Sequence, residues 1–108
     1  MAELTMQDMQ RMQKTLQDKY FEKWGGLSPE MAIQKLLWLH GELGEASDVI
    51  KKNGNASILE DSETRRHFIE ELCDVMMYFN DVLLCYDITP EEFAEIYIKK
   101  YDTNMSRW

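Results

Sequence analysis

The sequence predicts an all-α fold, and three observations lead to this prediction. Apolar residues recur at alternating steps of three and four, which is the helical period, and no stretch alternates apolar and polar residues as a strand does. The chain has only five glycines and two prolines, and its turn signals gather at three places. We therefore expect one domain, residues 1–108, with a four-helix bundle-like architecture.

Start and stop signals place the expected helices along the chain. The four helices are expected over residues 5–21, 29–52, 59–86 and 90–104. Ser28 and Thr89 each put a hydroxyl immediately before a proline that opens a helix. Residues 51–54, Lys-Lys-Asn-Gly, combine cations with a left-handed stop signal. The third helix has two candidate caps, Ser57 and Ser62.

The charge balance excludes several classes of protein. Twenty acidic residues against twelve basic ones give a formal net charge of −8. A chain without a basic stripe is a poor partner for polymeric nucleic acid and for anionic membranes. The sequence also lacks a secretory signal and any apolar run of the roughly 18 residues that span a bilayer. We therefore expect a cytoplasmic protein that binds neither polymeric nucleic acid nor membranes.

Two lines of side chains run along each of the two longest expected helices. On residues 29–52 the apolar line, predicted to face the core, is Leu36, Leu39, Leu43, Ala46 and Ile50. About 100° round the same helix lies a line with two carboxylates: Trp38, Glu42, Glu45 and Val49. On residues 59–86 the predicted core line is Phe68, Leu72, Val75, Phe79, Val82 and Tyr86. Its neighbouring line is His67, Glu71, Asp74, Tyr78, Asp81 and Cys85.

The spacing of four carboxylates predicts a metal site. Glu42 and Glu45 are three residues apart, as are Glu71 and Asp74, so each pair projects from one helix face. Antiparallel packing of the two helices, which their short connection favours, brings the pairs together. An all-oxygen cluster suits Mg²⁺, with Mn²⁺ as a substitute, whereas zinc and di-iron centres need thiolate or imidazole ligands. The alternative interpretation is a solvated acidic helix face, against which the flanking apolar residues argue.

Two stretches of the chain resemble a known family. Residues 36–52 (LLWLHGELGEASDVIKK), followed by residues 70–79 (EELCDVMMYF), are similar to the MazG-like, all-α nucleoside triphosphate pyrophosphatases. That family is marked by Glu-x-x-Glu on one helix and Glu-x-x-Asp on the next, and both motifs are present here. The tail, residues 100–107, resembles the Lys-x3-Asn-x2-Arg pattern that members use on substrate phosphates. The sequence departs from many members at Gly41, where they carry a further acidic residue.

The resemblance implies a metal-dependent nucleoside triphosphate pyrophosphohydrolase, which cleaves (d)NTP between the α and β phosphates to (d)NMP and pyrophosphate. It implies catalytic and Mg²⁺-binding roles for Glu42, Glu45, Glu71 and Asp74. For the substrate, it implies contacts from Lys100, Asn104 and Arg107 to phosphates, from Tyr78 to phosphate or sugar, and from Trp24 to the base. Two alternatives stay open: a phosphoribosyl-ATP pyrophosphatase, which shares the cleavage chemistry, and a non-catalytic helical dimerisation module.

The first expected helix predicts self-association. It carries an apolar line that a second subunit can cover: Met6, Met9, Met12 and Leu16. A bundle of 108 residues also has a shallow groove, which places the nucleotide near a subunit interface. The family resemblance points the same way, so we expect a homodimer or homotetramer.

Overall fold

The computed structural model describes residues 3–107, and every element in that range is a helix, which confirms the all-α class. The elements are α1 (Met6–Lys19), α2 (Phe21–Trp24), the 3₁₀ turn η1 (Pro29–Met31), α3 (Ala32–Asn53), α4 (Asn55–Glu60), α5 (Ser62–Cys85) and α6 (Pro90–Arg107). No helix within residues 3–107 has both the length and the apolar character that crossing a bilayer requires.

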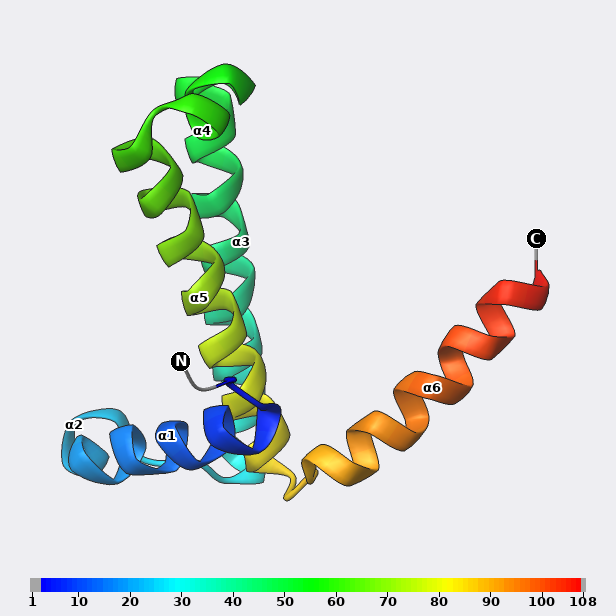
Figure 1. Ribbon diagram of the computed structural model, residues 1–108. Helices are drawn as coiled ribbons and strands as arrows, with labels where there is room; N and C mark the ends of the chain where they lie inside the picture. Colours follow the sequence, from blue (N-terminus) through cyan, green and yellow to red (C-terminus); the bar gives the residue numbers. More distant parts are fainter. Residues whose placement is uncertain (1–2, 108) are drawn as a thin grey trace.

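The helices α3 and α5 form the central pair of the fold. They run antiparallel side by side and share the most extensive contact in the chain, with α4 across their joined end (Figure 1). The other end of the pair is crossed by α1, which packs on α5 and continues into α2. The antiparallel pairing expected from the short connection is therefore confirmed.

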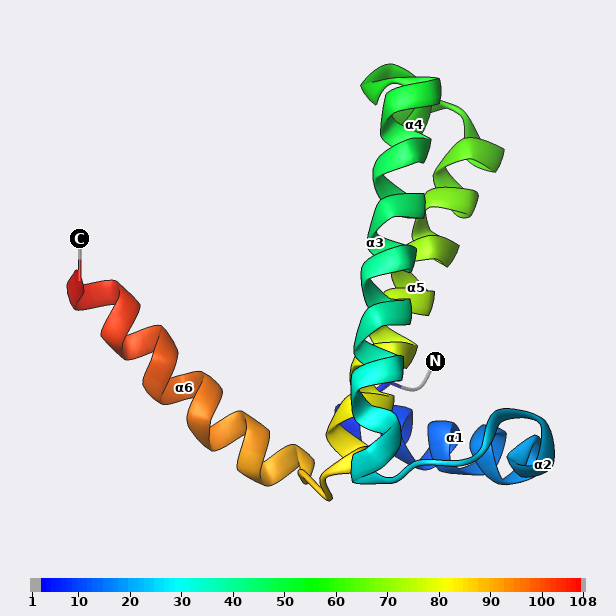
Figure 2. The ribbon, with the colours of Figure 1, turned by 180° about the vertical axis from the view of Figure 1, so that it is seen from behind.

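The last helix, α6, departs from the expected four-helix packing. Its first turn touches α5 through an edge-to-face contact of Phe93 with Phe79, whose ring centroids are 5.4 Å apart. Beyond that turn, α6 points away from α3 and α5, as both Figure 1 and Figure 2 show. The backbone between α5 and α6 turns at Asp87, whose φ of 54° is a left-handed conformation that aspartate tolerates. This turn redirects the chain, so the bundle expected from the sequence is not completed within a single copy.

Local capping explains several helix ends that the sequence predicts. Thr5 opens α1 with a capping box, because its hydroxyl accepts from the Asp8 backbone N–H and the Asp8 carboxylate accepts from the Thr5 backbone N–H. Thr89 accepts from the backbone N–H of Glu92 at 3.1 Å and so caps α6. α3 ends before Gly54, which has a φ of 84°, as the Asn-Gly signal predicts.

Other expected ends need correction. The expected helix 59–86 is divided between the end of α4 and α5, and α5 begins at Ser62, but neither Ser57 nor Ser62 is its N-cap. Asp61 caps α5 instead, with the Thr64 backbone N–H donating to its carboxylate at 3.0 Å. An ionised carboxylate is a stronger hydrogen-bond acceptor than a hydroxyl, which explains why Asp61 and not a serine caps α5. Ser28 precedes η1 without a side-chain capping hydrogen bond, and α1 ends at Lys19.

The core line predicted on α3 is also only partly right. Leu39 and Ala46 are buried as expected, but Leu36, Leu43 and Ile50 are 40%, 42% and 41% exposed. The buried face of α3 lies nearer to the carboxylate line than predicted. Its buried residues are Ala32, Lys35, Leu39, Ala46 and Val49. The helix is thus rotated about its axis relative to the prediction, and acidic residues lie beside the α3–α5 contact.

A polar face joins α1 to α5. The buried residues of α1 are three glutamines, Gln10, Gln13 and Gln17, whereas Met12 of the expected apolar line is exposed. The side-chain amide of Gln10 donates to the backbone carbonyl of Ile88 at 3.2 Å. The amides of Gln13 and Gln17 donate to the two carboxylate oxygens of Asp81. Hydrogen bonds from the glutamines to α5 and to the turn after it, rather than a methionine stripe, therefore fix α1 in place.

The Asp61 cap gives a test of the fold. We expect Asp61→Ala to lower the melting temperature, because α5 loses the side-chain acceptor of its first turn. The matched control is Glu60→Ala, which removes an exposed carboxylate one residue earlier. Thermal unfolding followed by circular dichroism measures both variants. Equal melting temperatures for the two variants would contradict the capping role.

A candidate metal centre and the cavity beside it

Three of the four predicted carboxylates meet where α3 lies against α5. Glu42, Glu45 and Glu71 each offer one carboxylate oxygen, and these oxygens all lie within 4.8 Å of one another. The three-residue spacing on α3 puts Glu42 and Glu45 on one face, and the antiparallel α5 brings Glu71 to them. Oxygens so close together can bind a single cation.

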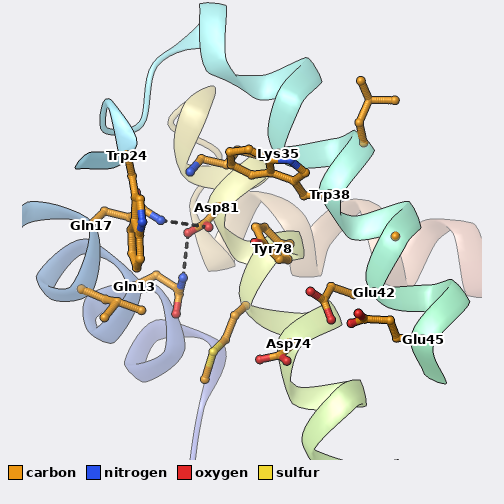
Figure 3. Close-up of a pocket in the computed structure, with 14 residues that line it drawn as sticks. Gln13, Gln17, Trp24, Lys35, Trp38, Glu42, Glu45, Asp74, Tyr78 and Asp81 are labelled. Carbon is orange, nitrogen blue, oxygen red and sulfur yellow. Dashed lines mark hydrogen bonds between the residues drawn. The ribbon is translucent and has the colours of Figure 1, made fainter. Parts of the chain in front are cut away.

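The fourth predicted ligand, Asp74, lies at the edge of this group. It is exposed and does not share the 4.8 Å cluster, but it lines the same cavity as Glu42 and Glu45 (Figure 3). Its negative charge also helps to raise the pKa of Glu42. The structure therefore gathers three of the expected ligands closely and leaves the fourth beside them.

The proximity of these carboxylates disfavours the ionised form of Glu42. Burial raises the pKa of Glu42 to about 7, assisted by its hydrogen bond with Glu45 and by the negative charges of Glu45, Asp74 and Glu71. Near neutral pH this carboxyl group therefore holds a proton part of the time. A divalent cation bound at the cluster would compensate the charge in place of that proton.

Two buried oxygens support the fit of a cation. Within residues 3–107, Glu42 Oε2 and Glu71 Oε2 are buried without a hydrogen-bond partner. The other oxygen of Glu71, Oε1, lies 3.8 Å from His67 Nε2. Buried acceptors without donors are costly, and hard oxygen ligands are those that Mg²⁺ prefers. The residues present therefore fit the predicted Mg²⁺ site.

A cavity of about 540 Å³ opens beside the carboxylates (Figure 3). Its aromatic walls are Trp24, Trp38 and Tyr78, and the rings of Trp38 and Tyr78 have centroids 6.0 Å apart. Burial, followed by the charge of Glu42, raises the pKa of Tyr78, so its hydroxyl stays a hydrogen-bond donor. The volume falls in the range of small-molecule sites. Two of the predicted substrate contacts, Trp24 and Tyr78, therefore line a common space with the acidic cluster.

Four polar residues of this cavity have no predicted role from the sequence. They are Gln13, Gln17, Lys35 and Asp81. Asp81 belongs to the predicted carboxylate line, and Gln10, Gln13 and Gln17 have helical spacing, so a signal existed for each. No feature of the sequence indicates that Lys35 lines a cavity, because a lysine at the start of a helix normally points to solvent. Burial raises the pKa of Asp81, although the hydrogen bond from Gln13 and the charge of Lys35 act against this rise.

The predicted phosphate-binding residues lie elsewhere. Lys100, Asn104 and Arg107 belong to the outer half of α6, which points away from α3 and α5 (Figure 2). None of the three lines the cavity beside the carboxylates. A single copy of the chain therefore does not bring this tail and the acidic cluster together.

Comparison of the chain with protein-family models, curated proteins and solved structures found no match. The similarity to MazG-like pyrophosphatases thus rests on the motifs of the sequence.

The raised pKa of Glu42 predicts a pH dependence of stability. Because the folded chain holds this proton more tightly than the unfolded chain, its contribution is fully present below the ordinary value of 4.5 and is lost as pH rises through about 7. Solvent screens a half-buried group, so we expect a loss of ~1 kcal/mol in metal-free protein between about pH 5 and pH 8. Thermal unfolding in the presence of a chelator measures this loss.

The control for this prediction is Glu42→Gln, which keeps the shape of the side chain and removes its titration. The variant should lose less stability than the parent over the same pH range, and added Mg²⁺ should stabilise the parent more than the variant at the upper end. The same pH dependence in both proteins would contradict the assignment to Glu42.

Proposed function

We propose that the protein is a Mg²⁺-dependent nucleoside triphosphate pyrophosphohydrolase, which converts (d)NTP and water to (d)NMP and pyrophosphate. The observation that carries this proposal is the group of three carboxylate oxygens within 4.8 Å of one another, of which Glu42 and Glu45 line a cavity with aromatic walls. A cation site beside a space with aromatic walls suits a ligand that joins a polyphosphate to a flat ring. The Glu-x-x-Glu and Glu-x-x-Asp motifs support the same activity.

The carboxylates would bind the metal ion and assist the attack of water. Glu42, Glu45 and Glu71, with Asp74 beside them, would hold Mg²⁺ or Mn²⁺. The bound ion would supply Lewis acidity, offsetting charge on the phosphate oxygens and lowering the pKa of a water molecule. One glutamate of the cluster would also accept a proton from the attacking water. The water oxygen would form a bond to the α phosphorus, the bond from that phosphorus to the oxygen bridging to the β phosphate would break, and pyrophosphate would leave with the bridging oxygen.

Aromatic and phenolic groups would orient the rest of the nucleotide. The indole rings of Trp24 and Trp38 offer faces on which a base can stack, and the Tyr78 hydroxyl can donate to a sugar or phosphate oxygen. Tyr78 lies between the carboxylates and the inner part of the cavity (Figure 3). In this proposal it would contact the middle of a bound nucleotide.

The α6 arm leads us to include a second copy of the chain in this proposal. Lys100, Asn104 and Arg107 reach phosphates bound at the carboxylates only if α6 of another subunit lies over the site. Apolar residues of α6 are exposed, among them Ile96, Tyr97 and Tyr101, and α3 exposes Leu36, Leu43 and Ile50. These surfaces are the kind that subunit contacts bury. We propose a homodimer or homotetramer with the nucleotide near the subunit interface.

The activity is tested by pyrophosphate release over a panel of ribo- and deoxyribonucleoside triphosphates and phosphoribosyl-ATP. We expect Mg²⁺-dependent release by the parent and a loss of roughly 100-fold or more in kcat for Glu42→Gln, because the cation loses a charged ligand. Glu63→Gln is the matched control, since it neutralises an exposed carboxylate on the helix that carries Glu71. It should retain the parent activity.

Other results of this assay, and of a thermal-shift measurement with metal ions, would contradict the proposal or favour one of the alternatives. Release that is unchanged in Glu42→Gln would contradict the proposed centre, and release from phosphoribosyl-ATP alone would assign the chain to that narrower activity. If neither Mg²⁺ nor Mn²⁺ shifts the melting temperature of the parent or of Glu71→Gln, the alternative of a non-catalytic dimerisation module is favoured.

Self-association is tested by sedimentation at micromolar concentration. We expect a dimer or tetramer for the parent and a shift toward monomer for the double variant Ile96→Glu with Tyr97→Glu, because two charges would enter an apolar contact. Glu95→Gln, at an adjacent exposed position of α6, is the control. A stable monomer for the parent would exclude the shared site.

A further inference from the structure

His67 lies one helical turn before Glu71 on α5 and pairs with the acidic cluster from outside. Its Nε2 atom is 3.8 Å from Oε1 of Glu71. Residues four apart share a helix face, and helical side chains lean toward the N-terminus, which brings Glu71 toward His67. Within residues 3–107, no other basic side chain forms an ion pair with a carboxylate of the cluster. In this part of the chain, His67 is therefore the basic partner of the cluster.

The two oxygens of Glu71 have different surroundings. Oε2 is buried and has no hydrogen-bond partner within residues 3–107. Oε1 faces His67, whose side chain is 57% exposed, whereas the Glu71 side chain as a whole is only 15% exposed. One oxygen is thus turned into the protein, where a cation can satisfy it, and the other is turned toward a ring nitrogen that can donate.

A carboxylate in this situation needs a partner that restrains its rotation. The terminal torsion of a glutamate has broad wells, so small rotations of the carboxylate plane cost little. Glu42 and Glu45 restrain each other through their shared hydrogen bond. Within residues 3–107, Glu71 forms no such bond inside the cluster, and its contact is the one with His67. His67 is therefore the group that can fix the orientation of Glu71.

The distance between His67 and Glu71 suits an ion pair that can tighten. At 3.8 Å, Nε2 and Oε1 are farther apart than in a direct N–H···O hydrogen bond. Hydrogen bonds at metal and catalytic sites are often long in the free protein and shorten when the full complex forms. The half-exposed imidazole has room to rotate toward Oε1. Its Nε2 donates both in the imidazolium and in the neutral Nε2–H tautomer, so the contact does not require one charge state.

We propose that His67 is a positioning residue of the metal centre: its Nε2–H donates to Glu71 Oε1 and so keeps Glu71 Oε2 directed at the bound divalent cation. Outer hydrogen bonds of this kind orient the carboxylates that bind metal ions, and their loss lowers metal affinity. This inference rests on the metal centre of the proposed function. It adds to that centre a residue outside the Glu-x-x-Glu and Glu-x-x-Asp motifs.

The test measures metal affinity, so that it does not depend on turnover. Isothermal titration of metal-free protein with Mg²⁺ and with Mn²⁺ compares the parent, His67→Leu and His67→Gln at one pH. We expect His67→Leu to weaken Mg²⁺ binding by roughly fivefold, less than the roughly 10–100-fold typical of such partners, because solvent screens a half-exposed group. His67→Gln should stay within about twofold of the parent, because its amide keeps an N–H donor at a similar reach. A merely structural role of the imidazole would not be rescued in this way.

The matched control is His40→Leu, which makes the same chemical change on α3. His40 is exposed and precedes Glu42 by two residues, so it faces another side of that helix. It should bind both ions as the parent does.

Mn²⁺ also gives a spectroscopic readout. A histidine that orients Glu71 from outside does not itself bind the ion. Pulsed electron paramagnetic resonance of the parent with Mn²⁺ should therefore show no coupling to a directly bound imidazole nitrogen. A nitrogen coupling that disappears in His67→Leu would make His67 a metal ligand and overturn the positioning role.

The inference is also overturned if His67→Leu binds Mg²⁺ as tightly as the parent, if His67→Gln loses as much affinity as His67→Leu, or if His40→Leu shows the same loss. Failure of the proposed function gives a different pattern. In that case His67→Leu weakens Mg²⁺ binding as expected, but the parent releases no pyrophosphate from any triphosphate. A parent that binds neither ion overturns both.

Discussion

The antiparallel contact between α3 and α5 is the constraint on which the rest of the molecule depends. It brings three carboxylates from two helices to one place, and burial there raises the pKa of Glu42 to about 7. Like charges so close together need a proton or a cation. We therefore expect the α3–α5 pair to lose stability as pH rises, and the same contact gathers oxygen ligands that suit a divalent ion.

The buried carboxylate of Asp81 has a second organising role. It accepts from Gln13 and Gln17, so it fixes α1 across α5 and, with Lys35, makes the inner end of the cavity polar. An apolar contact at this place would have closed the space and bound α1 without directional preference. Hydrogen bonding therefore keeps this end of the cavity polar and fixes the orientation of the Gln13 and Gln17 amides.

The exposed apolar surface connects the site to assembly. The rotation of α3 that turns its carboxylate line toward α5 leaves Leu36, Leu43 and Ile50 exposed, and the turn at Asp87 sends α6 away from the body. In one copy the predicted phosphate-binding tail lies away from the acidic centre, on the outer half of α6. A second copy would cover the exposed surfaces and bring its tail to the centre, which is why the shared site is part of the proposed function.

The sequence by itself determined the helical class, the breaks near residues 54 and 87, and the three-residue spacing of the carboxylates. Each of these depends on residues within a turn or two of one another, as with the capping box of Thr5 and Asp8. Only the tertiary structure decided that Asp81 pairs with the α1 glutamines, that Lys35 is buried and that α6 leaves the bundle. These features depend on how far each helix rotates about its axis and on which distant group satisfies a buried polar atom, and neighbouring residues in the sequence do not encode either one.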